Sequence, residues 1–183
     1  MRITANGEWL MAKVGIYGGS FNPIHFGHVE LARWVIEHTD LDELWLMVTP
    51  NNPLKPADSL APEEERLRAA REAVKDIPGV RVSDFEFSLP RPSYTAATLR
   101  ALEARYPEHE FALVIGEDNL RIADRWREWD WIARNHTIYV YPRHDQSPQT
   151  NHQSPITNAK NIRFLASAPY FDISSTQLRN AHL

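Results

Sequence analysis

Cysteine is absent from this chain of 183 residues, which excludes disulfide bonds, thiolate nucleophiles, zinc–cysteine sites and iron–sulfur clusters. No apolar run approaches the ~18 residues that a membrane-spanning helix needs, and residues 1–13 lack the apolar stretch of a secretory signal. A positive charge excess is also missing, because 20 Lys and Arg stand against 24 Asp and Glu, for a net charge of −4. These absences predict a cytoplasmic protein with no nucleic-acid partner and no membrane partner.

The composition that is present is typical of one globular domain. Hydrophobic residues make up 43% of the chain and charged residues 24%, which is enough apolar material for a core. We expect residues 11–183 to form a single domain, since a domain usually takes roughly 100 to 200 residues. Met11 is followed at once by Ala12, Lys13 and an apolar strand, so residues 1–10 are interpreted as an N-terminal extension without functional weight.

Short apolar runs alternate with helical periodicity along most of the chain. Buried strands are expected at 13–17, 44–48, 80–82, 111–115 and 137–141, and residues 162–165 return to apolar character. Helices are expected at 26–38, 62–75, 94–105, 126–133 and 173–180. The polar stretch 142–161 is interpreted as a surface loop. Because strands separated by helices are joined by right-handed crossovers, this order predicts an α/β fold with a parallel sheet and helices on both faces.

A glycine-rich segment follows the first expected strand and leads into the first helix. Gly18 and Gly19 let backbone N–H groups approach a bound oxyanion, and the start of the following helix offers further N–H groups to the same place. His25 and His28 are three residues apart, so both imidazoles project from one face if they lie in the first helical turn. The segment therefore predicts a phosphate site in which imidazoles stabilise negative charge. The alternatives are a tight turn with two packed histidines, or a two-histidine metal site.

A second candidate anion site lies near the other end of the chain. Ser174 and Thr176 place hydroxyl groups at an expected helix start, and Arg179 follows about one turn later. Taken alone, the same pattern also fits an ordinary helix cap with a solvent-facing arginine. Two such sites can still converge, because parallel α/β sheets bind ligands at the carboxyl ends of their strands.

The two motifs together closely resemble the paired H-x-G-H and I-S-x-T-x-x-R signature of the nucleotidylyltransferase superfamily, and specifically the bacterial nicotinate-nucleotide adenylyltransferase family. The resemblance runs from about Val14 to Arg179 and includes four intermediate segments in the same order: 50–55 (PNNPLK), 91–99 (RPSYTAATL), 115–119 (IGEDN) and Trp126. The first two motifs identify the superfamily, whereas the Ser-Tyr-Thr block and Trp126 indicate the nicotinate family. The fold implied by the resemblance is a Rossmann-like nucleotidyltransferase fold.

The activity implied by the resemblance is transfer of the adenylyl group of ATP to nicotinic acid mononucleotide, with Mg²⁺ as cofactor and no metal site built from protein residues. The products would be deamido-NAD and pyrophosphate, in NAD biosynthesis. By motif position, His25 and His28 would act on the triphosphate and the transition state. The remaining ATP-binding residues would be Gly18, Gly19, Ser20, Phe21, Gly116, Asp118, Arg143, Ser174, Thr176 and Arg179.

The resemblance also assigns residues to the mononucleotide. Trp126 would stack on the pyridine ring, while Tyr94 and Thr95, at a helix start, would accept the nicotinate carboxylate. Asn51 and Lys55 lie in a Pro-bounded loop that would contact the mononucleotide phosphate. Each of these residues also has a purely structural alternative. Trp126 could fill the core, Tyr94 and Thr95 could form an ordinary helix cap, and Lys55 could be a solvated side chain. Trp129 and Trp131 are interpreted as packing residues. For Asp118, too, a helix cap is the alternative.

The chain departs from the family at its carboxyl end. Members generally continue past the I-S-x-T-x-x-R helix, whereas this chain stops at Leu183, four residues after Arg179, so we expect a terminal helical segment to be missing.

Whether the chain forms a homo-oligomer is left open. So is the preference for nicotinate over nicotinamide mononucleotide. Two alternatives stay beside the main prediction: a related enzyme such as pantetheine-phosphate adenylyltransferase, and an ATP-binding module without catalysis.

Overall fold

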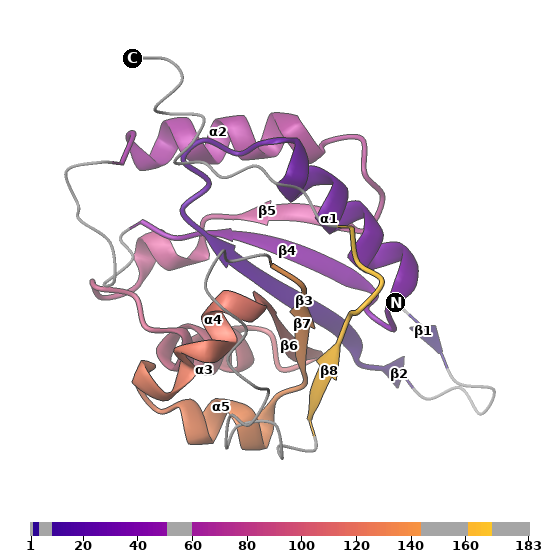
Figure 1. Ribbon diagram of the computed structural model, residues 1–183. Coiled ribbons are helices and arrows are strands. Elements are labelled where there is room, and N and C mark those ends of the chain that lie inside the picture. Colours follow the sequence, from indigo (N-terminus) through magenta and orange to yellow (C-terminus); the bar gives the residue numbers. More distant parts are fainter. Residues whose placement is uncertain (1, 4–8, 51–59, 144–160, 170–183) are drawn as a thin grey trace.

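A six-stranded parallel sheet forms the centre of the molecule in a computed structural model that describes residues 2–3, 9–50, 60–143 and 161–169 (Figure 1). The strand order is β5-β4-β3-β6-β7-β8. The strands are β3 (Ala12–Gly19), β4 (Glu43–Val48), β5 (Val80–Ser83), β6 (His109–Gly116), β7 (Ile138–Tyr141) and β8 (Ile162–Phe164). All five neighbouring pairs are parallel, as the alternation of strands and helices predicts.

Helices cover both faces of the sheet, which confirms the predicted fold class. On one face lie α1 (Phe26–His38) and α2 (Glu63–Val74), and on the other lie α3 (Thr95–Arg105), α4 (Glu117–Arg121) and α5 (Trp129–Asn135) (Figure 1). Two short 3-10 helices, η2 (Phe85–Ser88) and η3 (Ala123–Arg125), connect these elements. Each face has its own apolar core, one around Leu31, Val35 and Leu67 and the other around Leu99, Leu102 and Ile132. The sheet is therefore buried on both sides.

The strand order reverses between β3 and β6. From β3 the chain moves outward through β4 to β5, then returns to the other side of β3 and moves outward through β6, β7 and β8. The two halves of the sheet therefore part at the carboxyl ends of β3 and β6, which leaves a crevice there. Open α/β sheets bind ligands at this point, so the topology selects the region after Gly19 and Gly116.

Two element boundaries differ from the sequence prediction. Strand β3 continues through Gly18 and Gly19, which pair with Met47 and Val48, instead of ending at residue 17. The helix expected at 126–133 begins at Trp129, because the N–H of Trp126 still bonds the Ala123 carbonyl of η3 and Glu128 adopts a left-handed φ of 59°. The short elements α4, η2 and η3 were not predicted, since three to five residues carry too little periodicity.

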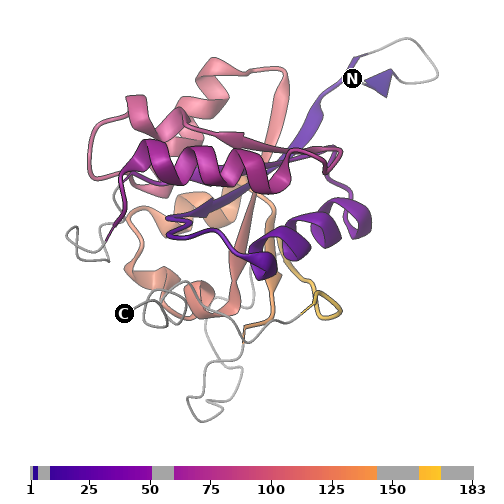
Figure 2. The ribbon, with the colours of Figure 1, turned by 90° about the horizontal axis from the view of Figure 1, so that it is seen from above.

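The amino-terminal residues add a small hairpin to this body. Strands β1 (Arg2–Ile3) and β2 (Trp9–Leu10) pair antiparallel and lie beyond the amino end of β3 (Figure 2). The interpretation of residues 1–10 as an extension stays a prediction. The expected helix 173–180 and most of the expected loop 142–161 lie outside the described residues. In the described part of the chain, no helix is long and apolar enough to cross a membrane.

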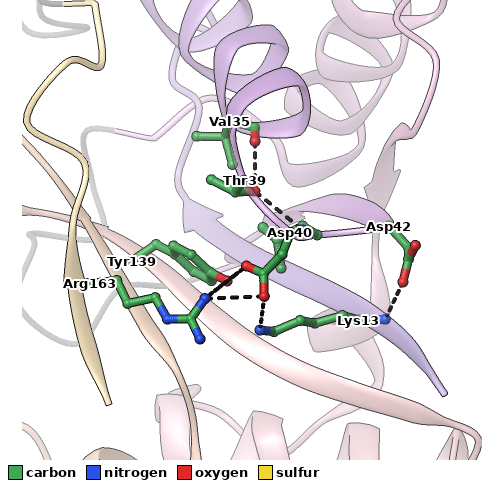
Figure 3. A network of polar contacts seen from close by, with 8 residues as sticks. Lys13, Val35, Thr39, Asp40, Asp42, Tyr139 and Arg163 are labelled. Carbon is green, nitrogen blue, oxygen red and sulfur yellow. Dashed lines mark hydrogen bonds and ion pairs between the residues drawn. The ribbon is translucent and has the colours of Figure 1, made fainter. Parts of the chain in front are cut away.

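A network of charges lies at the amino ends of the strands, opposite the ligand-binding edge (Figure 3). Asp40 pairs with Lys13 Nζ at 2.7 Å and with Arg163 Nη1 at 3.0 Å, and it accepts a hydrogen bond from the Tyr139 hydroxyl. Partial burial acts to raise the pKa of Asp40, but the hydrogen bonds from Lys13 and Tyr139 outweigh burial and hold that pKa well below its ordinary value. The network ties β3, β7 and β8 to the turn that precedes β4.

Candidate active site

The glycine-rich segment folds as the end of β3 followed by a tight, buried turn. The N–H of Thr49 donates to the Gly19 carbonyl at 2.9 Å, which joins this turn to the end of β4. Phe21 is buried and has a positive φ of 43°. A Cβ atom at Gly19 would lie 3.0 Å from the Phe21 ring, so a larger residue at position 19 would push this ring away from the backbone. The Phe21 ring therefore packs directly on the backbone at the end of β3.

His25 and His28 stand together at the start of α1, as their spacing predicts. His25 is the N-cap residue, and the two ring centroids are 3.7 Å apart with an interplanar angle of 30°. The backbone N–H of His25 donates to Nδ1 of His28 at 3.2 Å. Because Nδ1 of His28 is an acceptor in this bond, the proton of the neutral ring lies on Nε2. His28 therefore offers an N–H donor on the side of its ring away from the backbone.

The ring of His25 differs from that of His28 in its hydrogen bonding. Neither of its ring nitrogens has a hydrogen-bond partner among the described residues, although both atoms are buried. Burial lowers the pKa of His25, and the nearby positive charge of Arg143 lowers that pKa further. The ring is therefore biased toward its neutral form in the absence of ligand. An anion bound beside it would act in the opposite direction and favour the protonated ring.

Arg143 and Asp118 form an ion pair at the ends of β7 and β6. Arg143 Nη1 lies 3.0 Å from Asp118 Oδ2, whereas Asp118 Oδ1 is buried without a hydrogen-bond partner in the part of the chain that the structure describes. Asp118 folds back over Gly116, where an added Cβ atom would lie 2.3 Å from Oδ1. Glycine at 116 is thus required for this position of the carboxylate. Asp118 lies within α4 and not at its cap, which is Gly116.

A cavity of about 470 Å³ opens beside the histidines and the Arg143–Asp118 ion pair, on the face of the sheet that α3 covers. Its wall includes six of the predicted site residues: Gly18, Gly19, Tyr94, Thr95, Gly116 and Trp126. Trp126 is half-buried and makes an edge-on contact with the ring of Trp129, at 5.8 Å between centroids. Tyr94 is the N-cap of α3, and its ring lies under the guanidinium of Arg127 at 5.3 Å. A flat aromatic ring that carries polar groups fits such a wall.

The histidine cluster and the cavity adjoin each other at Tyr17, Tyr141 and Gly116. The Tyr17 ring lies 6.3 Å from that of His28 and 5.9 Å from that of Tyr141, and both tyrosines also line the cavity. Burial raises the pKa of both tyrosines, so their hydroxyls stay protonated at neutral pH. The site therefore has two halves. The basic half-site consists of His25, His28 and Arg143, and the aromatic half-site is the cavity beside Trp126. The two halves meet at the point where the strand order reverses.

The other predicted residues divide into two groups. Ser20, Phe21, His25, His28, Asp118 and Arg143 lie outside the cavity wall, and five of them surround the basic half-site while Ser20 is buried in the turn after β3. Asn51, Lys55, Ser174, Thr176 and Arg179 lie outside the described residues. Trp129 is buried in the core, and Trp131 packs partly buried against it, as expected for packing residues.

Arg66 is a buried residue that the sequence prediction missed. Only 3% of it is exposed, and its guanidinium donates to the carbonyls of Ser20, Thr49, Pro50 and Ala61 at 2.6 to 3.2 Å. It thereby joins the turns that follow β3 and β4. The signal was present, because positions 66, 70 and 74 are spaced by four and share the apolar face of α2.

Two further polar residues of the cavity wall were missed as well. Glu86 and Ser93 are 7% and 8% exposed, and both line the cavity. Glu86 lies in η2, which has no periodic pattern, so no signal in the sequence placed it at the site. Among the residues that the structure describes, no group of three or more His, Asp or Glu side chains is arranged to hold a metal ion.

The cytidylyltransferase-like family matches residues 16–181, which include the whole candidate site. The fold and the match together define the chain as a nucleotidyltransferase of the cytidylyltransferase-like class. The solved structure of Plasmodium falciparum nicotinic acid mononucleotide adenylyltransferase, complexed with NaAD, has the same fold: its TM-score is 0.74 at 16% identity, over 92% of this chain and 83% of that one. A second, from Vibrio parahaemolyticus, gives a TM-score of 0.62 at 22% identity, over 93% and 86%.

Curated relatives define the family more narrowly. A protein of Bacteroides fragilis named probable nicotinate-nucleotide adenylyltransferase is 48% identical over 92% of this chain and 81% of its own length. One of Flavobacterium johnsoniae with the same name is 43% identical over 92% of this chain and 86% of its own length. This chain therefore belongs to the nicotinate-nucleotide adenylyltransferase family, which confirms the resemblance of its motifs.

Proposed function

We propose that this enzyme transfers the adenylyl group of ATP to nicotinic acid mononucleotide and releases pyrophosphate. The observation that carries the proposal is the shared border of two half-sites at the end of β3. The basic half-site, around His25, His28 and Arg143, suits a polyphosphate, and the aromatic cavity suits a pyridine nucleotide. Membership of the family supports the same reaction and its place in NAD biosynthesis.

The reaction is an in-line displacement at the α-phosphorus of ATP. An oxygen of the mononucleotide phosphate forms a bond to that phosphorus, and the bond to the β-phosphate oxygen breaks, so that pyrophosphate leaves with the electron pair. No covalent enzyme intermediate is needed, and catalysis consists of positioning and charge stabilisation. The Nε2–H donor of His28 stabilises negative charge on the leaving phosphate, and His25 gains a proton more readily once that anion is bound.

The remaining predicted residues take the following roles in the proposal. Gly18 to Phe21 line the nucleotide, Gly116 and Asp118 contact the ATP ribose, and Ser174, Thr176 and Arg179 bind the β- and γ-phosphates. Trp126 stacks on the pyridine ring, while the start of α3 at Tyr94 and Thr95 receives the nicotinate carboxylate. Asn51 and Lys55 contact the mononucleotide phosphate. Cytoplasmic location and the absence of a nucleic-acid partner stay predictions from the sequence.

Mg²⁺ is the proposed cofactor, and it is bound mainly through the phosphates of ATP. The residues of the site fit this arrangement, since Mg²⁺ in nucleotide sites uses one or two carboxylates together with substrate phosphates and water. The Oδ1 atom of Asp118, which no described residue bonds, is one such oxygen at the edge of the basic half-site. When bound, Mg²⁺ neutralises charge on the phosphate oxygens.

A pyrophosphate-release assay with ATP, Mg²⁺ and nicotinic acid mononucleotide tests the proposed function. Release that depends on the mononucleotide, with deamido-NAD as the second product, is expected. Binding of ATP without release would favour an ATP-binding module, and release only with 4′-phosphopantetheine would favour a pantetheine-phosphate adenylyltransferase. Side-by-side rates with the nicotinate and nicotinamide mononucleotides measure the preference between the two.

A further inference from the structure

Among the residues that the structure describes, three buried polar atoms in the wall of the aromatic cavity have no hydrogen-bond partner. They are Oε2 of Glu86, Oγ of Ser93 and Nε1 of Trp126. Leaving such a buried atom unpaired is destabilising when nothing else satisfies it. Three of them around one cavity indicate a site that is completed by a polar ligand, in addition to the aromatic contact already assigned to Trp126.

In the described part of the chain, Glu86 is the one carboxylate that lines this cavity. Its Oε1 atom accepts a hydrogen bond from Thr98 Oγ1 at 2.8 Å, which fixes the side chain against α3. No described residue bonds its Oε2 atom. Burial raises the pKa of Glu86, and the hydroxyls of Thr98 and Thr49 act in the opposite direction. Within the described ranges, Glu86 forms no ion pair, and the hydroxyl of Thr98 is the group that lies at hydrogen-bond distance from it.

The chemistry of the mononucleotide determines what a carboxylate oxygen can bind there. The nicotinate carboxylate and the phosphate are anions that mainly accept hydrogen bonds at neutral pH, and the substituted ring nitrogen carries no proton. The hydroxyls of the ribose are the ligand's hydrogen-bond donors. The positive charge of the pyridinium ring also favours a nearby carboxylate over a neutral side chain.

We propose that Oε2 of Glu86, assisted by the Ser93 hydroxyl, binds a ribose hydroxyl of the mononucleotide and so selects a ribonucleotide as the adenylyl acceptor. The inference rests on the proposed function, because it takes the mononucleotide as the ligand of the aromatic cavity. A purely structural role for Glu86 would need only the bond to Thr98, which the Oε1 atom supplies alone. A structural role does not explain why the Oε2 atom is buried with no hydrogen-bond partner among the described residues.

The test compares the ribonucleotide with its 2′-deoxy and 3′-deoxy analogues in the full-length enzyme. The parent chain and the Glu86→Gln variant are each assayed for kcat/KM with all three acceptors. Glutamine keeps the side-chain volume and an oxygen for Thr98 but replaces the acceptor at Oε2 with an amide donor. The parent enzyme is expected to lose about 10-fold or more with at least one deoxy analogue, as for loss of a hydrogen bond to a charged group. The Glu86→Gln variant is expected to lose less than about threefold with the same analogue.

Control variants separate this role from a general effect on the fold. Glu72→Gln removes an exposed carboxylate on α2, outside the cavity wall, and is expected to discriminate against the deoxy analogue as the parent enzyme does. The KM for ATP and the melting temperature are expected to be unchanged in Glu86→Gln. If Glu86→Gln fails to fold, Ser93→Ala gives the same comparison with a smaller change in side chain.

Equal discrimination against the deoxy analogues by the parent enzyme and Glu86→Gln would overturn the inference, and so would a parent enzyme that accepts all three equally. An effect of Glu86→Gln confined to the choice between nicotinate and nicotinamide mononucleotides would also overturn it, because Glu86 would then act at the ring carboxylate. In each of these cases the parent enzyme still turns over the ribonucleotide. Failure of the proposed function itself would show instead as no mononucleotide-dependent release of pyrophosphate.

Discussion

At the residue scale, the most informative detail of the site is which nitrogen of His28 carries the proton. The bond from the His25 backbone N–H to Nδ1 of His28 fixes the ring and assigns Nε2 as the donor. Neither pattern nor spacing contains this information. The sequence predicts that the two imidazoles share a helix face, and the backbone geometry then decides what each ring can donate.

Replacement of His28 by alanine is expected to lower kcat by about 10²-fold or more, because it removes a positioned donor to the leaving phosphate. The matched control is His38→Ala, which removes an exposed histidine at the other end of α1 and is expected to leave kcat unchanged. Steady-state kinetics and circular dichroism of both variants check this. A His28→Ala enzyme as fast as the parent would exclude this histidine from catalysis.

Replacement of Trp126 by alanine is expected to raise the KM for the mononucleotide more than the KM for ATP. The indole lies in the cavity wall and packs on Trp129, so its loss removes a stacking surface on the mononucleotide side only. Trp126→Phe keeps an aromatic face and is expected to retain part of the affinity. Measured KM values that rise equally for both substrates would indicate that Trp126 fills the core.

At this scale, sequence motifs predicted which residues lie together at the carboxyl edge of the sheet. The glycines at 19 and 116 and the two histidines all occupy positions that the backbone or the ring contacts explain. Glu86 and Ser93 were missed, because one lies in a 3-10 helix without periodicity and the other precedes the helix cap. Their importance depends on which atoms are left unpaired, and only packing in three dimensions determines that.

At the element scale, Arg66 connects the turn that follows β3 with the turn that follows β4. The carbonyl of Ser20 belongs to the turn after β3, and those of Thr49 and Pro50 follow β4. Helix α2 thus fixes one turn relative to the other through a single side chain. We regard Arg66 as a positioning residue, since the contacts the structure gives for it are to backbone carbonyls.

The Arg66→Met variant is expected to be less stable by about 2 kcal/mol or more, which lowers Tm by roughly 5 °C, because buried carbonyls lose their donor. We also expect a higher KM for both substrates, since both turns lose the same support. Arg68→Met, on the exposed face of the same helix, is the control and should change neither quantity. Unchanged KM values in a destabilised Arg66→Met protein would restrict Arg66 to a structural role.

The elements themselves could be predicted to within a few residues wherever a strand or helix is long. The sequence identifies α1 with its observed bounds and most of the sheet, because apolar periodicity determines which face of each element is buried. The start of α5 could not be predicted. It depends on the left-handed backbone at Glu128, whose carboxylate pairs with Arg100 of α3 at 2.6 Å.

At the scale of the whole molecule, the two ends of the parallel strands have different roles: one end forms the ligand site and the other contributes to stability. The carboxyl ends of the strands hold the two half-sites, whereas the amino ends hold the network around Asp40. The network contacts strands from both halves of the sheet. Acid stability should therefore depend on this edge more than on the active site.

The Asp40→Asn variant is expected to be less stable than the parent at neutral pH, by about 1 kcal/mol after allowance for the half-exposed carboxylate. Because the folded-state pKa of Asp40 is lowered, its contribution is fully present above the unfolded pKa near ~4 and is lost as the pH falls below it. Urea unfolding at pH 7, 5 and 3 checks this. A stability difference that stays constant across that range would contradict the assignment.

The most direct test of the account follows the α-phosphate of ATP. The purified enzyme is incubated with ATP labelled at that phosphate, Mg²⁺ and nicotinic acid mononucleotide, and the products and the protein are separated. The account predicts that the label passes into deamido-NAD in amounts equal to the pyrophosphate released, with none on the protein. Label that stays in ATP, or that becomes bound to the protein, would contradict direct transfer between two neighbouring half-sites.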